Sequence, residues 1–490
     1  MTAEETADIL VIGFGAAGAA AAITAHDLGA KVILLEKAVA GGGSTEASGG
    51  NIRQIRDVEG AIRHFCTLAD QGTPEDVVVA QVHGLTLLPE WLLELGAHFR
   101  GTDAPVPLGL PSGESAGGST FGQSAFPDVE DSEALGGRLQ LAGTPNSSGG
   151  EALWQFLESV VKARKIPVRH GAGAKRLLRD HQSGRIVGVE VSGGSRPQMI
   201  DARLGVILAC GGFNWAPEMH VDLFGTVLPA LTPPHRNSGD GIRMAQEVGA
   251  QLWHMSAIAA RFGYQFPEYE AAFKSTPPSN GFFYVDQLGR RFVDETGVIF
   301  HAAGRIMLER DPYTGKLVRC PSFMVFDETT RLSGPIGPQP NGHNRTYDWS
   351  SDNHVEIDRG WIHRASTIAE LAAWIGVPAP ELERTASRYN AARLSGSDDC
   401  RRSPQKMEPV EKPPFYAVPL WPCLLNTQGG PRRNARAEVL DVHGEPIPGL
   451  YSAGELGSMW GQLYPGAGNI GEALVTGQIA ARSAWESDGL

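Results

Sequence analysis

The clearest hydrophobic pattern lies near the start of the chain. Residues 7–12 form an apolar run with the length and composition of a buried strand. After a glycine-rich turn, an alanine-rich run to about Leu28 has helix composition, and Gly29 ends it. A second apolar run, residues 31–35, predicts another buried strand that closes on Glu36. The pattern therefore predicts a strand–helix–strand unit with an acidic residue at its end.

Gly13, Gly15 and Gly18 form a GxGxxG motif between the first strand and the helix. Such glycines permit a tight turn, close approach of a pyrophosphate and close packing of the helix on the strand. The free N–H groups and the positive dipole of the helix N-terminus attract phosphate. Glu36 follows Gly18 by 18 residues, where a carboxylate can accept hydrogen bonds from ribose hydroxyls. Residues 8–36 thus predict a dinucleotide-binding unit.

Two later glycine-rich segments favour FAD as the dinucleotide. Residues 41–50 follow the acidic strand directly and are small, so that the chain can lie along a flat, extended cofactor. Residues 450–455 have the pattern of a strand that turns into a ligand-contacting loop. Residues 466–469 precede a predicted helix over 470–484. A chain that returns to the site in this way is expected to complete a flavin pocket.

Composition and charge exclude several other classes of protein. The chain has 490 residues, of which 42% are hydrophobic and 20% charged, enough for two or three domains. A formal net charge of −13 without a long Lys/Arg run argues against nucleic acid and anionic membranes as partners. The five cysteines lack CxxC spacing, which argues against disulfide, zinc-ribbon and haem frameworks. An acidic start and the lack of 18 uninterrupted apolar residues argue against secretion and membrane spans, so we expect a cytoplasmic protein.

The sequence resembles the flavoprotein subunit family of fumarate reductase and succinate dehydrogenase, which includes the 3-ketosteroid dehydrogenases. The resemblance covers nearly the whole chain and depends on the order and spacing of short segments. These segments are Val11–Gly18, Leu35–Lys37, Gly42–Thr45, Ala47–Gly50, Leu208–Phe213, Ser238–Gly241, Gly289–Glu295, Thr427–Gly430 and Ala453–Glu455.

The resemblance implies an α/β fold with two domains. Residues 1–254 and 420–490 would form a discontinuous, Rossmann-like FAD-binding domain, and residues 255–419 an inserted α+β domain that caps the substrate. Within the inserted domain, residues 365–373 and 380–393 have the pattern of amphipathic helices. Residues 313–350 are rich in Pro, Gly and Asn, which predicts surface loops.

The resemblance also implies the residues that contact the cofactor. They are Gly13, Gly15, Ala16, Ala17, Gly18, Glu36, Lys37, Gly42, Gly43, Ser44, Thr45, Ser48, Gly49, Gly50, Ala209, Gly211, Gly239, Asp240, Gly454, Glu455, Asn469 and Ile470. The histidine to which some family members attach the flavin covalently has no counterpart in residues 41–50. FAD is therefore expected to be bound non-covalently.

The groups with which fumarate reductases hold a dicarboxylate are missing here. Ile299 stands where the family has a proton-delivering arginine, and Asn426 where it has a substrate-binding histidine. Near Tyr464, the late arginine of the family is also absent. A dicarboxylate would lose charge-assisted hydrogen bonds worth about 1.5–3 kcal/mol each. Fumarate and succinate are therefore disfavoured, although Arg432, Arg433 and Arg53 could bind an anion in another pose.

The segment Tyr464-Pro-Gly-Ala-Gly468 is similar to the YPGPG segment of 3-ketosteroid dehydrogenases. In that family the tyrosine hydroxyl and the N–H of the last glycine bind the ketone oxygen of the substrate. Polarising a carbonyl acidifies its α C–H bond, and an uncharged donor pair suits an apolar ketone. Asn426, Thr427 and Gln428 are expected to line the same pocket. The alternative is that Tyr464 only packs beside a turn.

The acid/base group is less clear from the sequence. Where ketosteroid dehydrogenases have a catalytic tyrosine, this chain has Ile299, which has no proton to offer. His301 is the nearest titratable substitute, and Tyr284 is the next candidate. A lone histidine is more often a surface or core residue than a catalyst.

These observations predict a FAD-dependent oxidoreductase acting on a C–C bond next to a carbonyl, with a cyclic ketone or enone as substrate. One alternative is a reductase of another activated alkene, such as an unsaturated carboxylate, that uses Arg432 or Arg433. A second is a flavin-binding redox sensor without turnover. No second GxGxxG follows a clear strand, so the electron donor or acceptor stays open.

Overall fold

The computed structural model describes residues 5–100, 126–144, 147–192, 197–297, 301–337 and 347–487, and these fall into two compact units. The first unit comprises residues 1–219, 235–257 and 426–490, and the second comprises 220–234 and 258–425. The domain division predicted from the sequence assigns residues 220–234 to the FAD-binding domain. They belong to the second because the Leu231 N–H bonds the Leu424 carbonyl at 2.8 Å.

The first unit is built on a sheet whose core is parallel. Its parallel strands run in the order β5 (Val168–Arg169), β2 (Val32–Leu35), β1 (Glu5–Ile12), β8 (Gln198–Leu208) and β18 (Pro446–Ser452). Three antiparallel strands extend it, namely β6 (Ala174–Arg179), β7 (Ile186–Val191) and β17 (Glu438–Leu440). Strands β1 and β2 are buried throughout their apolar runs, as the hydrophobic pattern predicts.

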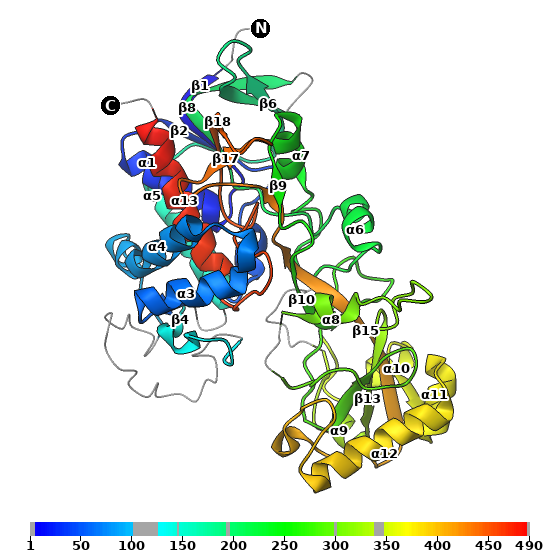
Figure 1. Ribbon diagram of the computed structural model, residues 1–490. Helices are drawn as coiled ribbons and strands as arrows, with labels where there is room; N and C mark the ends of the chain where they lie inside the picture. Colours follow the sequence, from blue (N-terminus) through cyan, green and yellow to red (C-terminus); the bar gives the residue numbers. More distant parts are fainter. Residues whose placement is uncertain are drawn as a thin grey trace. The chain divides into compact units, whose positions relative to one another are not determined.

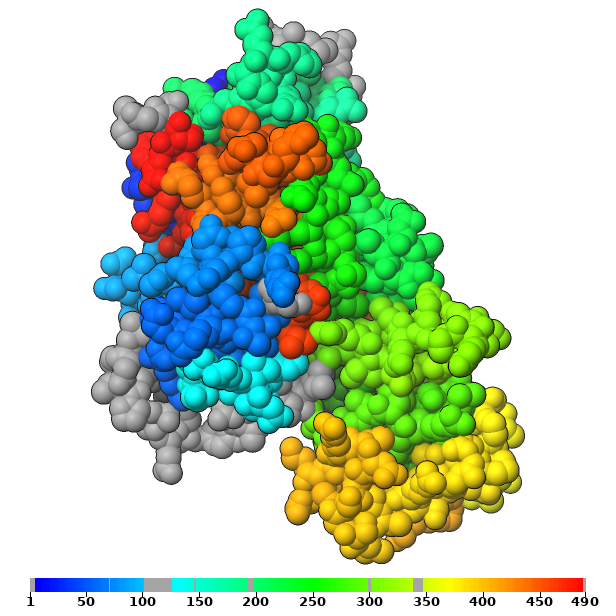
Figure 2. Space-filling model, in the orientation of Figure 1, coloured from blue at the N-terminus to red at the C-terminus, as the bar shows by residue number. Residues whose placement is uncertain are grey.

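Smaller elements complete the first unit. Two short sheets pair β3 (Ile52–Ile55) with β4 (Leu135–Leu139), and β9 (Leu252–Trp253) with β16 (Gly430–Pro431). The helices are α1 (Ala16–Asp27), α2 (Gly43–Ala47), α3 (Val58–Ala69), α4 (Glu75–Glu94), α5 (Gly149–Ala163), α7 (Asp240–Glu247) and α13 (Asn469–Glu486). In Figure 2, the blue surface of α3 and α4 adjoins the red and orange surface of the C-terminal segment.

The carboxyl ends of the central strands lie in register at one edge of the sheet. Ile12 of β1 pairs with Leu35 of β2 and with Leu208 of β8, and Leu208 pairs with Ser452 of β18. The segments that follow these four strands therefore meet there, as expected for a ligand site in an open α/β sheet. Figure 1 shows α1 and α13 beside this sheet.

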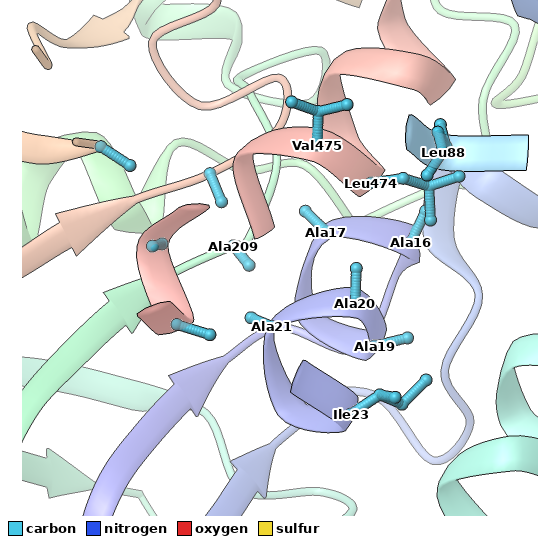
Figure 3. Close-up of a cluster of buried hydrophobic side chains, with 14 of the residues drawn as sticks. Ala16, Ala17, Ala19, Ala20, Ala21, Ile23, Leu88, Ala209, Leu474 and Val475 are labelled. Carbon is cyan, nitrogen blue, oxygen red and sulfur yellow. The ribbon is translucent and has the colours of Figure 1, made fainter. Parts of the chain in front are cut away.

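Helices α1 and α13 pack closely because their facing residues are small. Ala16, Ala17 and Ala20 of α1 lie beside Leu474 and Val475 of α13 (Figure 3). Deeper in the contact, a Cβ atom on Gly477 of α13 would lie 2.4 Å from the main-chain oxygen of Ala17. The alanine run of the sequence thus serves a backbone-to-backbone contact between the two ends of the chain.

The second unit contains an antiparallel sheet and a helical layer. Its strands run in the order β11 (Phe273–Lys274), β10 (Ile258–Tyr264), β15 (Phe415–Thr427), β13 (Ser322–Asp327) and β12 (Phe282–Val285), and β14 (His363–Ala365) pairs with β15. Its helices are α8 (Ala303–Met307), α9 (Glu328–Leu332), α10 (His354–Asp358), α11 (Ile368–Ile375) and α12 (Ala379–Ser395). The chain passes between the units four times, within α6 (Pro217–Phe224), between residues 234 and 235, between residues 257 and 258, and near the end of β15.

The sequence predicted two helices of the second unit and missed one of its strands. The two amphipathic patterns correspond to α11 and α12, and α11 begins later than predicted because Thr367 caps it, accepting the N–H of Glu370 at 3.1 Å. The expectation of surface loops over 313–350 was wrong in part, because it includes the fully buried strand β13. Proline, glycine and asparagine flank that strand on the C-terminal side and masked its short apolar run.

The Gly289–Glu295 motif has a structural role within the second unit. The buried Glu295 carboxylate accepts from Arg291 at 2.8 Å and from Arg402 at 3.2 Å, and Arg291 also binds Asp398. These ion pairs join residues 291–295 to residues 398–402.

In the part of the chain that the structure describes, no helix is long and apolar enough to span a bilayer.

We expect Gly477→Val to lower the melting temperature of the FAD-loaded protein. A side chain there must push α13 away from α1, and overpacking of this kind costs about 1–3 kcal/mol. Arg482→Val is the matched control, because it places the same β-branched residue on an exposed face of α13. Thermal unfolding followed by flavin fluorescence measures both. Equal melting temperatures for the two variants would contradict the tight contact.

Candidate functional site

The GxGxxG turn connects β1 to α1 at the sheet edge. A Cβ atom on Gly18 would lie 1.9 Å from the main-chain oxygen of Gly13, so the turn closes on itself without space for a side chain. Gly13 has a φ of +105°, in the region that favours glycine. Helix α1 has no side-chain cap on Gly15, and the Ala16 N–H donates to Thr45 Oγ1 at 2.9 Å. Thr45 thus serves the first N–H of α1, and the positive end of the helix dipole suits a pyrophosphate.

Glu36 lies at the end of β2 and holds the same turn. Its side chain is buried, and its two oxygens accept the N–H of Phe14 at 3.0 Å and the N–H of Ala38 at 2.8 Å. Each carboxylate oxygen has lone pairs left for a further donor. The geometry therefore fits both the structural role seen here and the ribose contact expected from the sequence.

Lys37 and Asp240 form a second charged contact near the site. The Lys37 ammonium bonds Asp240 Oδ2 at 2.9 Å and also bonds the hydroxyl of Ser238. Burial alone would raise the pKa of Asp240, but the hydrogen bond from Lys37 and its charge hold that pKa below its ordinary value. Two residues predicted for cofactor binding are thus brought together from separate segments.

The segment over residues 41–50 is organised by short polar contacts. The Ser48 hydroxyl donates to the Thr45 carbonyl at 2.7 Å and accepts the N–H of Gly50 at 3.0 Å. Ser44 accepts from the Asn237 side chain at 3.0 Å. The segment starts beside the turn, since the Gly42 N–H donates to the Phe14 carbonyl at 2.8 Å. The small residues lie along the edge where the sequence predicts the cofactor.

A buried polar cluster connects the segments that follow β8 and β18 with the segment that precedes α7. Asn237 contacts both oxygens of Glu455, at 3.4 and 3.3 Å, and Glu455 Oε1 also accepts the N–H of Thr427 at 3.2 Å. The Thr427 hydroxyl in turn accepts the N–H of Phe213 at 2.9 Å. Burial raises the pKa of Glu455 to about 8, so this carboxyl is mainly protonated at neutral pH.

Several buried amide groups in the described part of the first unit have no hydrogen-bond partner. These are Asn426 Nδ2, Gln428 Nε2 and Oε1, and Asn469 Oδ1. Asn426 and Gln428 are buried, and leaving such atoms without partners costs about 1–3 kcal/mol each. The pyrimidine edge of a flavin offers both donors and acceptors, which these amides can pair with. The residues present therefore fit FAD.

The remaining residues predicted for the cofactor lie at the same strand ends. Ala209 and Gly211 follow β8, Gly239 is the N-cap of α7, Gly454 follows β18, and Asn469 and Ile470 begin α13. The Gly454 N–H donates to Thr476 Oγ1 of α13 at 2.9 Å. The predicted set thus gathers at one edge, from segments that are distant in the sequence.

The Tyr464–Gly468 segment forms the turn before α13. The Tyr464 hydroxyl accepts the N–H of Gly468 at 3.0 Å and the N–H of Asn469 at 3.2 Å. From the sequence, the Gly468 N–H was expected to donate to the substrate directly. In the structure it donates to Tyr464 instead, because the turn folds the phenol back over the start of the helix.

Arg53 binds two carbonyl oxygens of this turn. Its guanidinium, which is 1% exposed, donates to the carbonyl oxygen of Gly466 at 2.8 Å and to that of Pro465 at 3.5 Å. The sequence singled out Arg53 only as one of three arginines that could bind an anion. Asn237 was missed, although it directly precedes the Ser238–Gly241 motif.

The two acid/base candidates belong to the second unit. Tyr284 on β12 is 3% exposed, and burial raises the pKa of its hydroxyl to about 12. His301 is half-buried next to β10, where its carbonyl oxygen accepts the N–H of Ala260 at 3.0 Å. Ile299 lies outside the described residues. In the described part of the chain, no group of His, Cys, Asp and Glu side chains could hold a metal ion.

Comparison with known proteins agrees with this geometry. The sequence model of the FAD binding domain family matches residues 8–470. The 4-oxocyclohexanecarboxylate 2-dehydrogenase of Sinomonas cyclohexanicum is 27% identical over 98% of this chain and 93% of its own length. The 3-oxosteroid 1-dehydrogenase of Mycobacterium tuberculosis (strain H37Rv) is 28% identical over 98% of each chain.

A solved structure shows the same fold. The 3-ketosteroid delta1-dehydrogenase from Sterolibacterium denitrificans superposes with a TM-score of 0.83 and 21% identity, over 99% of this chain and 100% of that one. The predicted α/β fold, the family resemblance and the prediction of a FAD-dependent oxidoreductase are confirmed. The chain belongs to the FAD binding domain family.

Proposed function

We propose that this enzyme oxidises or reduces a C–C bond next to the carbonyl of a cyclic ketone or enone. The observation that carries the proposal is the position of the Tyr464 hydroxyl, which accepts two main-chain N–H groups at the start of α13. Hydrogen bonds accepted by a hydroxyl polarise it and strengthen it as a donor. Relatives named for oxosteroid and oxocyclohexane substrates support a ketone as the acceptor.

In the proposed reaction, the cofactor handles the electrons, and the side chains handle the proton and the carbonyl oxygen. FAD, when bound, takes up or supplies the two electrons as hydride. In the oxidative direction, a base removes the α proton, the electron pair moves towards the carbonyl oxygen, and the β hydrogen leaves as hydride. Tyr464 donates to that oxygen while its charge develops, which is where a fixed donor lowers the barrier. The N–H of Gly468 acts through Tyr464.

His301 and Tyr284 remain the proposed acid/base groups. The His301 imidazole is the proposed acceptor of the α proton. Tyr284 is a poorer base because burial raises its pKa to about 12 and disfavours the phenolate. In the reductive direction, the same protonated phenol is a suitable acid. We therefore propose His301 first and Tyr284 second.

The alternative of an unsaturated carboxylate held by Arg432 or Arg433 is less well supported. Arg433 is 1% exposed and pairs with Glu472 at 2.6 Å, so its charge is already neutralised. Arg432 lies over the ring of Trp253, with its guanidinium carbon 5.6 Å from the ring centroid. Neither offers a ready carboxylate site. Membership of an enzyme family also disfavours a sensor without turnover.

We expect Tyr464→Phe to slow flavin reduction by a cyclic ketone about 100- to 1000-fold, because it removes one donor from the developing enolate. FAD content should barely change, since the ring remains. The rate is measured anaerobically by stopped-flow absorbance. Tyr313→Phe, at a position 95% exposed, is the control and should behave as wild type. A Tyr464→Phe rate within about threefold of wild type, or about 0.7 kcal/mol, would rule out the carbonyl contact.

We expect the FAD to be bound non-covalently and to depend on Glu36. Acid precipitation should leave intact FAD in the supernatant, and yellow pellets would contradict this. Glu36→Arg should raise the dissociation constant for FAD by about 10-fold or more, since a charge-assisted hydrogen bond worth about 1.5–3 kcal/mol is lost. Glu59→Arg, on an exposed face of α3, is the charge-matched control. Titration of apoprotein with FAD measures all three proteins.

We expect reduced enzyme to be reoxidised by fumarate only slowly. Asn426 is a neutral side chain where a charged donor is needed, and Arg433 is engaged by Glu472. Anaerobic mixing of dithionite-reduced enzyme with millimolar fumarate, and separately with a cyclic enone, compares the two substrates. Faster reoxidation by fumarate than by the enone would favour the carboxylate alternative.

A further inference from the structure

His254 lies where three segments of the first unit meet. It directly follows β9, and its imidazole stacks on the Trp253 ring with 4.4 Å between the ring centroids. The Nδ1 atom is 2.7 Å from the carbonyl oxygen of Ser458, and Nε2 is 3.5 Å from Thr73 Oγ1. A Cβ atom on Gly461 would lie 2.5 Å from Nε2, so the main chain there packs directly on the ring. The histidine thus contacts both the segment that leads to α13 and the segment that leads to α4.

Both ring nitrogens of His254 face hydrogen-bond acceptors. A carbonyl oxygen cannot donate, so Nδ1 must carry a proton in its contact with Ser458. The Thr73 hydroxyl has a single proton, which it donates to the carbonyl oxygen of Met459 at 2.7 Å. Towards Nε2, the Thr73 oxygen can therefore only accept. All of these contacts are satisfied together when the ring is an imidazolium that donates from both nitrogens.

The surroundings of the ring oppose this positive charge. Burial lowers the pKa of His254, and the charges of Arg432 and Arg433 act in the same direction, while hydrogen bonds to main-chain oxygens partly offset them. Arg433 is itself paired with Glu472 at 2.6 Å. The pKa of His254 is therefore lower than the ordinary value of about 6.5. As the pH rises, the ring loses its second proton on the acid side of that value.

Loss of this proton leaves the hydrogen-bond network one donor short. The contact with Ser458 is the shorter of the two, so the remaining ring proton stays on Nδ1. The lone pair of Nε2 then faces the Thr73 oxygen, and the hydroxyl satisfies it by turning away from Met459. The protonation state of the ring thus decides whether the Thr73 hydroxyl holds Met459 or His254.

We propose that His254 and Thr73 form a pH-sensitive latch on residues 458–461. The latch is closed when the ring is protonated, because Thr73 then holds Met459, and it opens when the ring is neutral. His254 acts here as a positioning residue through Thr73. The latch works in the same way whatever the substrate of the enzyme.

Residues 458–461 connect the latch to the candidate site. The Ser458 N–H donates to the carbonyl oxygen of Gln428 at 2.8 Å, and Gln428 is one of the buried amides that fit FAD. Two residues after the latch, the Leu463 N–H donates to the carbonyl oxygen of Leu68 at 2.9 Å, and the Tyr464 turn follows directly. Opening of the latch therefore loosens the stretch of chain that leads into this turn.

The test is hydrogen exchange of the FAD-loaded protein, followed by mass spectrometry of the peptide that covers residues 459–464. Rates are compared at about pH 5 and about pH 8, the range in which histidine changes its charge. Each rate is divided by that of the same peptide in unfolded protein, which removes the intrinsic effect of pH. Since the latch is one hydrogen bond, we expect the corrected rate to be about 2- to 10-fold higher at the higher pH. The peptide that covers α1 reports any general change in stability.

Three variants separate the latch from a merely structural histidine. His254→Asn should abolish the pH step, because asparagine does not titrate and tolerates the left-handed backbone at this position, where φ is +54°. Thr73→Val keeps the shape of the side chain without the hydroxyl and should exchange at the faster rate at both pH values. Thr73→Ser keeps the hydroxyl and should keep the step. His83→Asn, at an exposed position of α4, is the matched control and should behave as wild type.

Nitrogen-15 NMR of the histidine rings in the wild-type protein checks the proton positions without a variant, with His254 assigned through its contact with the Trp253 ring. We expect a proton on Nδ1 alone in the neutral ring and protons on both nitrogens in acid. A neutral ring protonated on Nε2, a wild type without the pH step, or a step that persists in His254→Asn or Thr73→Val would each overturn the latch. Flavin reduction in Tyr464→Phe tests the proposed function independently of these outcomes.

Discussion

The site depends on the register of four parallel strands. Ile12, Leu35, Leu208 and Ser452 end their strands at one level, so the segments that follow must share a narrow edge. Space there is so limited that Gly18 approaches a main-chain oxygen where no Cβ atom would fit. The GxGxxG turn, the main-chain contacts of Glu36 and the buried polar cluster all lie at this shared edge.

The buried arginines Arg53 and Arg433 bind main-chain carbonyl oxygens at this site more often than they bind carboxylates. Arg53 binds the carbonyl oxygens of the Tyr464 turn, and Arg433 reaches the carbonyl oxygens of Ser452 and Gly454 in addition to Glu472. A guanidinium can serve several carbonyl oxygens because its donors form a rigid, planar array. Loops that would otherwise be mobile are thereby fixed to the sheet, which is what a site for a large planar cofactor requires.

The sequence predicted the strand–helix–strand unit well, because its glycines, alanines and Glu36 each have a local physical reason. It also predicted that distant glycine segments would converge. It could not predict that Gly468 would donate to Tyr464, since this depends on how a turn of five residues folds over a helix end. Nor could it show that Arg53 would lie beneath that turn, because the 412 positions that separate Arg53 from Pro465 carry no local pattern.

The close contact between α1 and α13 has a consequence for how the protein is made. Helix α1 is synthesised before the segments of the second unit, and α13 is synthesised after them. Until then, the face of α1 that α13 covers stays open, and the edge of the sheet lacks its β18 strand. The second unit, whose segments lie between, can form first. A nascent chain must therefore keep its first unit open until α13 has been synthesised, and this interval is when chaperones would matter most.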